Sequence, residues 1–257
     1  MEMLNPHCRI DRDDRGVVRL TICNAGSLNI LSSAVTDAVR EGLTSLATDR
    51  DIRAVILAGQ SEKSMIGGAD IREMAKLDQK SAEAFITRLR DLCEAVRAFP
   101  APVIARLPGW CLGGGLEVAA ACDFRIAAHD ARFGMPEVRV GIPSVIHAAL
   151  LPRLIGWGRA RWLVMTAENI DAPTALAWGL VNVVAPPAAL NPASGLPSDP
   201  NVDLAAPVPS PDGHQIAFVS GGQVWIMNAD GTRPTALTRL DPVAFPYSCR
   251  APAWTRA

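Results

Sequence analysis

Apolar positions along the first 185 residues form two kinds of pattern, short runs and long stripes at helical spacing. The short runs predict strands at 16–23, 53–58, 103–105, 123–127 and 181–184. The stripes predict helices from Ser32 or Ser33 through Leu46, and at 81–99, 115–121, 145–154, 159–165 and 172–178. Strands that alternate with helices indicate an α/β fold with crossover connections.

The helix predicted at 81–99 carries the clearest stripe. Phe85, Leu89, Leu92 and Val96 recur at the spacing of one helical face, which we expect to point inward. The apolar run at 53–58 is uninterrupted, as in a strand buried on both faces.

The pattern changes after Val184, and the change divides the chain into three predicted parts. Residues 1–185 form the core. Residues 186–208, rich in proline and small residues, read as a linker. Residues 209–257 use strand-like runs, and those at 214–220 and 223–228 flank Gly221 and Gly222 as a β-hairpin would.

Composition and charge narrow the class of protein. The 257 residues are 49% hydrophobic with a formal charge of −1, which is typical of a folded chain without general attraction for nucleic acids or acidic membranes. The six cysteines show no CxxC spacing, so we expect reduced, mostly buried thiols. The first residues lack a signal-like apolar stretch, and no apolar run is long enough for a membrane helix; a cytoplasmic protein is expected.

Two glycine-rich segments, 63–70 and 112–117, are the first candidates for chemistry. Glycine lets a backbone approach a ligand closely, and the start of a helix offers unpaired N–H groups. Two such loops facing each other would bind one developing oxyanion. Two ordinary tight turns are the alternative. Neither segment follows a dinucleotide or Walker pattern.

Two carboxylates accompany the second loop. Glu117 falls in the first turn of the helix that the glycines open, and Glu137 follows Pro136. A pair of glutamates can hold one water, with one accepting a proton while the other donates or orients. Alone, each is more often a solvated or helix-capping residue, and the spacing does not bring the two together.

The remaining polar residues support no other common site. Ser144 lacks the G-x-S-x-G context of a hydrolase triad, so surface or satisfied core roles are expected for His129 and His147. No His, Cys and Asp cluster has the spacing of metal ligands.

Together these segments resemble the crotonase (enoyl-CoA hydratase/isomerase) superfamily, from the first predicted strand to about Val184. KSMIGGADIREM resembles the family's first oxyanion loop, PGWCLGGGLEVAAACDFRIA the second, and FGMPEVRVGIP the segment with the second acid. The resemblance implies a ββα-spiral core with helices packed around the sheets. It also implies N–H donors at Ala69 and Gly114, and catalytic acids at Glu117 and Glu137.

The implied reaction is syn hydration of a 2-enoyl-CoA to a 3-hydroxyacyl-CoA, as in fatty-acid degradation. No cofactor is implied besides the CoA of the substrate. The resemblance assigns substrate and CoA contacts to Lys63, Gly67, Gly68, Asp70, Ile71, Arg72 and Gly113. Isomerisation of an enoyl-CoA, or another crotonase chemistry, would use the same oxyanion loops.

The sequence departs from the family pattern at two places. After Gly141 it reads IPSVIHAALL, where the family often has a glycine-rich stretch ending in Thr-Gln-Arg. The family's closing helices, which cover the acyl-CoA and support a homotrimer or hexamer, are replaced by a tail that resembles one TolB-type β-propeller blade. We hypothesise that this replacement weakens CoA binding and oligomerisation. An inactive fusion or interaction protein is therefore the alternative to an active enzyme.

Overall fold

A seven-stranded mixed sheet forms the centre of the protein in the computed structural model, which describes residues 1–190, 205–209, 215–220, 223–228 and 232–236. The strands, in spatial order, are β1 (Glu2–Asn5), β2 (Cys8–Arg12), β3 (Val17–Ile22), β4 (Ala54–Gly59), β5 (Val103–Leu107), β7 (Phe124–Ala128) and β10 (Val183–Ala185). The pairs β1–β2 and β2–β3 are antiparallel, and the pairs from β3 to β10 are parallel.

A second, three-stranded sheet consists of β6 (Trp110–Leu112), β8 (Arg132–Gly134) and β9 (Ile170–Asp171). β6 pairs parallel with β8, and β8 pairs antiparallel with β9. β6 leads directly into a helix at Gly114, so this small sheet fixes where that helix begins.

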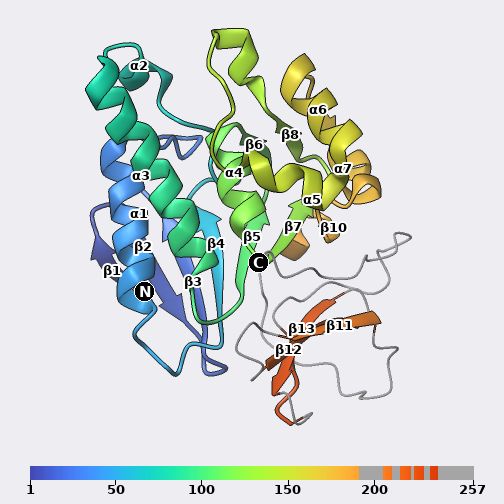
Figure 1. The fold of residues 1–257 in the computed structure, drawn as a ribbon. Coiled ribbons are helices and arrows are strands. Elements are labelled where there is room, and N and C mark those ends of the chain that lie inside the picture. The colour runs from blue at the N-terminus through green and yellow to red at the C-terminus, as the bar shows by residue number, and fades with distance from the viewer. Residues whose placement is uncertain (191–204, 210–214, 221–222, 229–231, 237–257) are drawn as a thin grey trace.

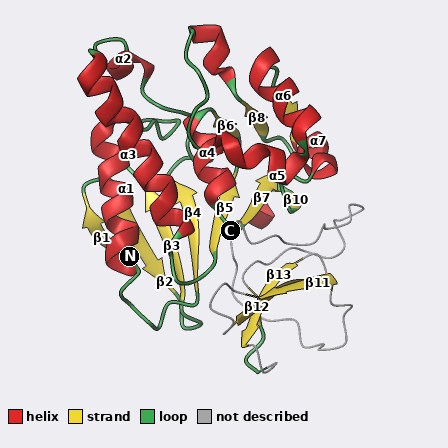
Figure 2. Ribbon diagram, viewed as in Figure 1, coloured by secondary structure: helices red, strands yellow, loops and turns green. Residues whose placement is uncertain are grey.

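Helices cover the sheets, and α1, α3 and α4 lie across one face of the seven-stranded sheet (Figures 1 and 2). The α-helices are α1 (Ser33–Leu46), α2 (Ile71–Met74), α3 (Gln79–Arg97), α4 (Gly114–Ala121), α5 (Leu151–Ile155), α6 (Trp157–Thr166) and α7 (Ala172–Trp178). Three short 3-10 helices are η1 (Pro136–Val140), η2 (His147–Leu150) and η3 (Pro187–Leu190).

Local sequence signals account for the long helices. Ser32 caps α1, as predicted, by accepting a hydrogen bond from the Val35 N–H. α3 begins two residues earlier than predicted, because Asp78 and Ser81 form a reciprocal capping box there. Its predicted inward stripe is confirmed, since all four of its residues are buried.

Strand β4 confirms the expectation of a strand buried on both faces. All six of its residues are buried, between parallel neighbours β3 and β5. The parallel strands run in one direction, so their carboxyl ends gather at one end of the sheet. In open α/β sheets, this is the end at which ligands bind.

The predicted helix at 145–154 differs from the structure. Residues 143–146 are irregular, η2 follows, and α5 begins only at Leu151. The backbone of Ile146 is non-helical, with φ −100° and ψ −106°, and the N–H of Ala148 bonds to the Glu117 side chain instead of a carbonyl one turn back. Strands β1, β2, β6, β8 and β9 were not predicted, because they are short or mostly polar.

A four-stranded antiparallel sheet follows the core. Its strands, adjacent in chain order, are β11 (Ala205–Pro209), β12 (Gln215–Ser220), β13 (Gln223–Asn228) and β14 (Thr235–Ala236). The predicted hairpin is confirmed in β12 and β13, while its Gly221-Gly222 turn lies outside the described residues. The range predicted as a linker contains η3 and most of β11. Residues 237–257 also lie outside the described part.

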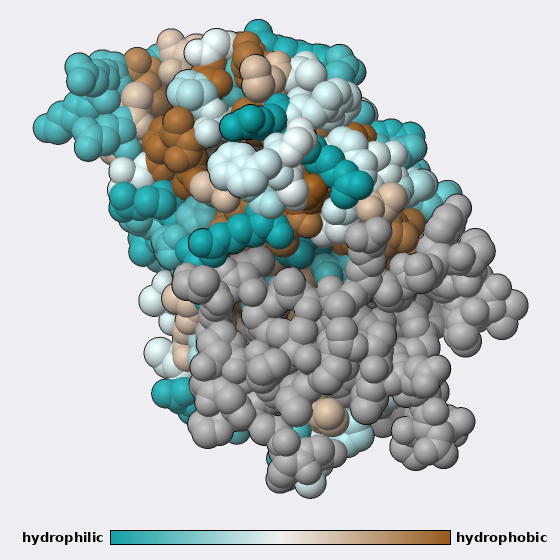
Figure 3. Space-filling model, turned by 45° about the vertical axis from the view of Figure 1, so that its right-hand side comes forward, coloured by the Kyte–Doolittle hydropathy of each residue, from teal (hydrophilic) through white to brown (hydrophobic). Residues whose placement is uncertain are grey.

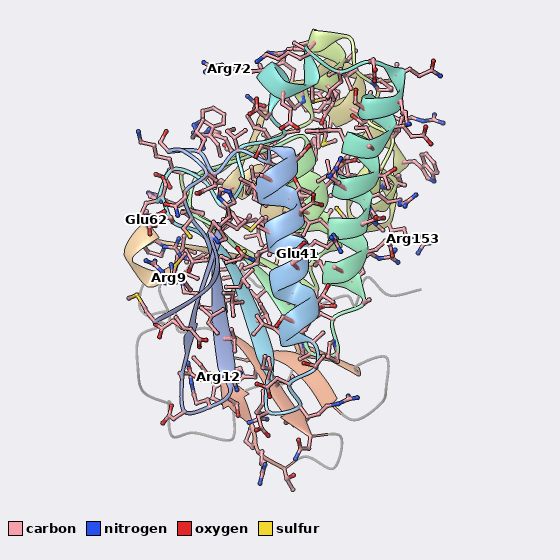
Figure 4. The ribbon with its side chains drawn as sticks, turned by 90° about the vertical axis from the view of Figure 1, so that its left-hand side faces the viewer. Arg9, Arg12, Glu41, Glu62, Arg72 and Arg153 are labelled. Carbon is pink, nitrogen blue, oxygen red and sulfur yellow. The ribbon has the colours of Figure 1, made fainter. Side chains whose placement is uncertain are left out.

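This C-terminal sheet contacts the core at the end of the main sheet where β3 and β4 begin. Arg53 donates to Thr235 Oγ1 at 2.6 Å and to the Arg233 carbonyl at 3.0 Å, and Arg15 donates to the Ala236 carbonyl at 3.0 Å. Ile226 is fully buried and belongs to the same apolar cluster as the core. Figures 1 and 4 show this sheet at the opposite end from α2 and Arg72.

The described part of the chain combines buried cysteine thiols with a partly apolar surface. The five cysteines in the described range are free and buried, as expected, and Cys249 lies outside it. Hydrophobic side chains also reach the surface of the core (Figure 3), and Val145, Trp157 and Met165 are each more than half exposed. None of the helices in the described ranges combines the length and apolar character needed to cross a bilayer.

Candidate active site

A cavity of about 290 Å³ opens between the two glycine-rich loops and helix α3. Its walls come from residues 67–71, from the inward side of α3, from the start of α4, from η1 and from residues 142–146. Most of the lining is apolar, including Phe85 and Leu89 of the predicted stripe. Both Glu117 and Glu137 line the same cavity, so the structure brings together the two acids that spacing alone left apart.

The two glycine-rich loops meet at this cavity. A Cβ placed on Gly114 would lie 3.9 Å from the Cβ of Ala69. Gly114 is the first residue of α4, where an N–H has no partner within the helix. Among the backbone hydrogen bonds of the described residues, none uses the N–H of Ala69 or of Gly114. Two predicted donors therefore lie unpaired beside one cavity.

Glycine is required where the second loop turns into α4. Gly113 has φ +51°, and a Cβ there would lie 2.5 Å from Glu137 Oε1. A Cβ on Gly115 would lie 2.2 Å from the Ile66 carbonyl oxygen of the first loop. The first contact seats a carboxylate against the loop, and the second packs the two loops together.

Glu117 is a buried acid, only 4% exposed, in the first turn of α4. Its Oε1 accepts a hydrogen bond of 2.8 Å from the N–H of Ala148. Burial raises the pKa of Glu117 to about 7, and the nearby charge of Glu137 adds to this rise against the opposing backbone N–H groups of residues 146–148. Near neutral pH this carboxyl group can both hold and release a proton.

Glu137 reaches the cavity from η1, where Pro136 starts the turn. Burial raises the pKa of Glu137, opposed by its own backbone N–H and by the nearby Ser144 hydroxyl. Glu137 Oε2 and Ser144 Oγ are both buried, and neither has a partner within hydrogen-bonding geometry among the described residues. Two unpaired polar atoms beside Glu117 are suited to holding a small polar molecule.

The other predicted contacts fall into two groups. Gly67, Gly68, Ile71 and Gly113 line the cavity. Asp70 does not line it; its carboxylate caps α2 by accepting from the N–H groups of Arg72 and Glu73, at 2.9 and 3.1 Å. Lys63 and Arg72 are exposed outside the cavity, and Arg72 projects from the α2 end of the molecule (Figure 4).

Sequence reasoning missed two parts of the site. Ser144, considered from the sequence only as a triad nucleophile, lines the cavity, and Ala148 acts only through its backbone, which no residue type signals. His129 is exposed beside Asp130, as expected of a surface histidine, whereas His147 is buried with only its Nε2 paired, to Glu94. In the described ranges, no group of three His, Cys, Asp or Glu side chains is placed to bind a metal ion.

Known proteins resemble this chain in sequence and in fold. A profile of the enoyl-CoA hydratase/isomerase family matches residues 12–193. The chain is 40% identical over 175 residues to the short-chain-enoyl-CoA hydratase of Clostridium acetobutylicum, which covers 68% of this chain and 67% of that protein. It is 39% identical over 167 residues to the crotonyl-CoA hydratase of Syntrophomonas wolfei, covering 65% and 64%.

Solved structures give the same result. The crystal structure of an enoyl-CoA hydratase from Bacillus anthracis aligns with a TM-score of 0.69 and 36% identity, covering 72% of each chain. The α/β architecture, with helices packed around a mixed sheet, is therefore shared. The matched part of the chain spans 67% and 64% of the length of these two curated hydratases, and the family profile ends at residue 193, before β11 begins.

Proposed function

The chain belongs to the enoyl-CoA hydratase/isomerase family, and we propose that it catalyses the syn addition of water to a 2-enoyl-CoA, giving a 3-hydroxyacyl-CoA. One observation carries this proposal: the buried Glu117 and the half-buried Glu137, both with raised pKa values, line one cavity beside which two backbone N–H groups lie unpaired. Carboxylic acids whose pKa values are raised toward 7, placed beside an oxyanion site, are suited to transferring a proton to and from a carbon next to a thioester carbonyl.

The N–H groups of Ala69 and Gly114 bind the thioester oxygen in this mechanism. Water held between Glu117 and Glu137 adds its oxygen to C3; the π electrons of the C2=C3 bond form a C1=C2 bond, and those of the carbonyl move onto the thioester oxygen. One glutamate accepts the proton that the water loses, and the pair returns a proton to C2 as the enolate collapses. The unpaired Ser144 hydroxyl adds a further hydrogen-bonding group for that water.

The lining of the cavity supports an apolar acyl group. Met74, Phe85, Ile86 and Leu89 form its walls, and none of these side chains carries a hydrogen-bonding group suited to a polar acyl substituent. The CoA portion extends outside toward exposed cations, for which Lys63 and Arg72 remain the proposed phosphate contacts.

The test is hydration of crotonyl-CoA by the full chain, followed by loss of the conjugated thioester absorbance. Glu117→Gln and Glu137→Gln should each lower kcat by roughly 10²- to 10⁴-fold, the usual contribution of a general acid or base. Glu41→Gln, the same change on the exposed side of α1, should leave kcat unchanged (Figure 4).

Each alternative has its own outcome. A shifted double bond without a 3-hydroxyacyl product would replace hydration by isomerisation. A folded chain without turnover of any enoyl-CoA would contradict the proposal and favour the inactive interaction protein. Retention of full activity in both glutamine variants would remove the two acids from the mechanism.

We also propose that β11–β14 form a single blade-like repeat of the propeller type. Four antiparallel strands adjacent in chain order support this proposal. A trimer or hexamer of the kind the family implies is tested by size exclusion with light scattering, and a stable trimer would count against the hypothesis that the tail weakens assembly.

A further inference from the structure

A buried histidine, next in sequence to the residue that bonds to Glu117, contacts the C-terminal turn of helix α3. The side chain of His147, on η2, is 8% exposed, and its Nε2 lies 2.9 Å from Glu94 Oε1 on α3. Arg97, less than one turn along α3, donates to the same oxygen at 2.9 Å. Glu94 is therefore held from two sides, and η2 is tied to α3 through its first residue.

The next residue of η2 completes the link to the site. The N–H of Ala148 donates to Glu117 Oε1 at 2.8 Å. The backbone of Ile146 before η2 is non-helical, and no side chain caps the start of η2. A four-residue 3-10 helix has few internal hydrogen bonds. Contacts with the rest of the protein must therefore fix the direction of the Ala148 N–H.

We propose that His147 is a positioning residue, whose hydrogen bond to Glu94 holds η2 against α3 so that the Ala148 N–H stays directed at Glu117. This inference rests on the proposed function, because it concerns the orientation of a proposed catalytic acid. His147 itself is not among the residues that line the cavity.

The protonation state of the His147 ring follows from its hydrogen bond to Glu94. A carboxylate only accepts hydrogen bonds, so Nε2 of His147 carries the proton. Nδ1 is buried, with no hydrogen-bond partner among the described residues, which fits a ring protonated at Nε2 alone. Burial also lowers the pKa of His147, against the opposing effect of Glu94, so the ring is neutral at pH 7.

Loss of the link should be visible in the titration of Glu117. The Ala148 N–H favours the ionised carboxylate and so opposes the rise in pKa that burial causes. The titratable groups that interact with Glu117 are Glu137 on η1 and Cys93 on α3, and the backbone N–H groups of Ile146 and His147 act on it as well. With the first two unchanged, displacement of the Ala148 N–H moves the pKa of Glu117 further upward.

The kinetic test compares His147→Leu with His147→Gln, whose amide can still donate to Glu94. His147→Leu should lower kcat by roughly 10- to 100-fold, the equivalent of one hydrogen bond to a charged group, with KM changed by less than about twofold. The limb of the pH–rate profile that belongs to Glu117 should move to higher pH. His147→Gln should retain most of kcat and the original profile.

The partner residue has a matched control on the same helix. Glu94→Ala should reproduce the effect of His147→Leu, and the double variant should be no slower than either single one. Asp91→Ala removes another arginine-paired acid from α3, one bonded to Arg90 and not to η2, and should behave as the unaltered chain. Equal, additive losses from all three variants would indicate general destabilisation and overturn the proposal.

An amide measurement separates this inference from the proposed function. In ¹⁵N-alanine-labelled protein, the Ala148 resonance, identified by its loss in Ala148→Gly, should shift as Glu117 titrates. In His147→Leu that shift should disappear, and the amide should exchange at least about tenfold faster. An unchanged Ala148 amide would overturn the positioning role, whether or not the chain hydrates crotonyl-CoA.

Discussion

Glu117 lies where an ionised carboxylate is poorly solvated, and its Oε1 accepts a hydrogen bond from the Ala148 N–H. The same burial that prepares the acid for proton transfer near pH 7 opposes folding once the acid ionises. At this residue the burial that favours proton transfer also lowers the stability of the fold, and the pH determines how much, because it determines how far the carboxyl group is ionised.

The free energy of unfolding should reveal this conflict. An ordinary glutamate has a pKa of 4.5, whereas burial raises the pKa of Glu117 to about 7 in the folded state. Between these values the folded state keeps a proton that the unfolded state has lost. The contribution of Glu117 to stability is therefore fully present below pH 4.5 and declines as pH rises through 7, by about 3 kcal/mol in total.

Urea unfolding at pH 5 and pH 8 measures this decline. Glu117→Gln cannot ionise, so it should gain stability relative to the unaltered chain between pH 5 and pH 8. Exposed Glu41→Gln should show no such gain. An equal loss of stability from pH 5 to pH 8 in the unaltered chain and in Glu117→Gln would contradict a raised pKa of Glu117 as its cause.

Residue types predicted the two acids but not their supports. Glu117 and Glu137 stand in motifs that a reader of sequence can match to a family. Their convergence on one cavity depends on η1 packing beside the start of α4, which no local spacing contains. The Ala148 N–H leaves no trace in the sequence, because every residue except proline has one.

At the scale of elements, the site depends on where a loop becomes a helix. Gly113, just before α4, has φ +51°, and Glu137 occupies the space that a side chain would fill. Gly113→Ala should therefore strain the backbone and displace the Glu137 carboxylate, lowering kcat by roughly 10²-fold, as a misplacement of about 1 Å in an active site does.

Gly156, between α5 and α6, offers a matched control. It has φ +82°, and a Cβ there would meet no atom within 4 Å, so Gly156→Ala carries the backbone strain without a clash. Both alanine variants should lower the melting temperature, and only Gly113→Ala should lower kcat. Equal kcat values in the two variants would show that the Glu137 contact does not matter for the rate.

The elements themselves were predictable where one face or both faces of a segment are buried. α3, α7 and β4 follow their apolar patterns closely. The helix predicted at 145–154 was wrong over its first turn, because backbone N–H groups there turn toward Glu117. Strands β6 and β8 have three residues each, too few for an alternating pattern to be recognised.

On the scale of the whole molecule, the C-terminal sheet and the cavity lie at opposite ends of the core. The contact involves the Arg53 and Arg15 hydrogen bonds and the fully buried Ile226. The division into three parts stays a prediction. Ile226 of β13 belongs to the same apolar cluster as the core.

Ile226→Ala should show how strongly the two sheets depend on each other. Loss of this buried side chain should cost about 2–4 kcal/mol and lower the melting temperature of the whole chain in one transition. Met227→Ala, the half-buried neighbour on the other face of β13, should cost less. In both variants kcat should stay unchanged. Two separate melting transitions would instead mean that the C-terminal sheet unfolds alone.

The packing of Gly115 against the Ile66 carbonyl has a consequence for how this protein can evolve. Any side chain at Gly115 would meet the backbone of the other loop, which no rotamer change can relieve. A lineage therefore cannot exchange Gly115 in a single step while the first loop keeps its place. New acyl specificities should arise instead in the surrounding cavity wall, where side chains such as Phe85 and Ile86 can be exchanged one at a time.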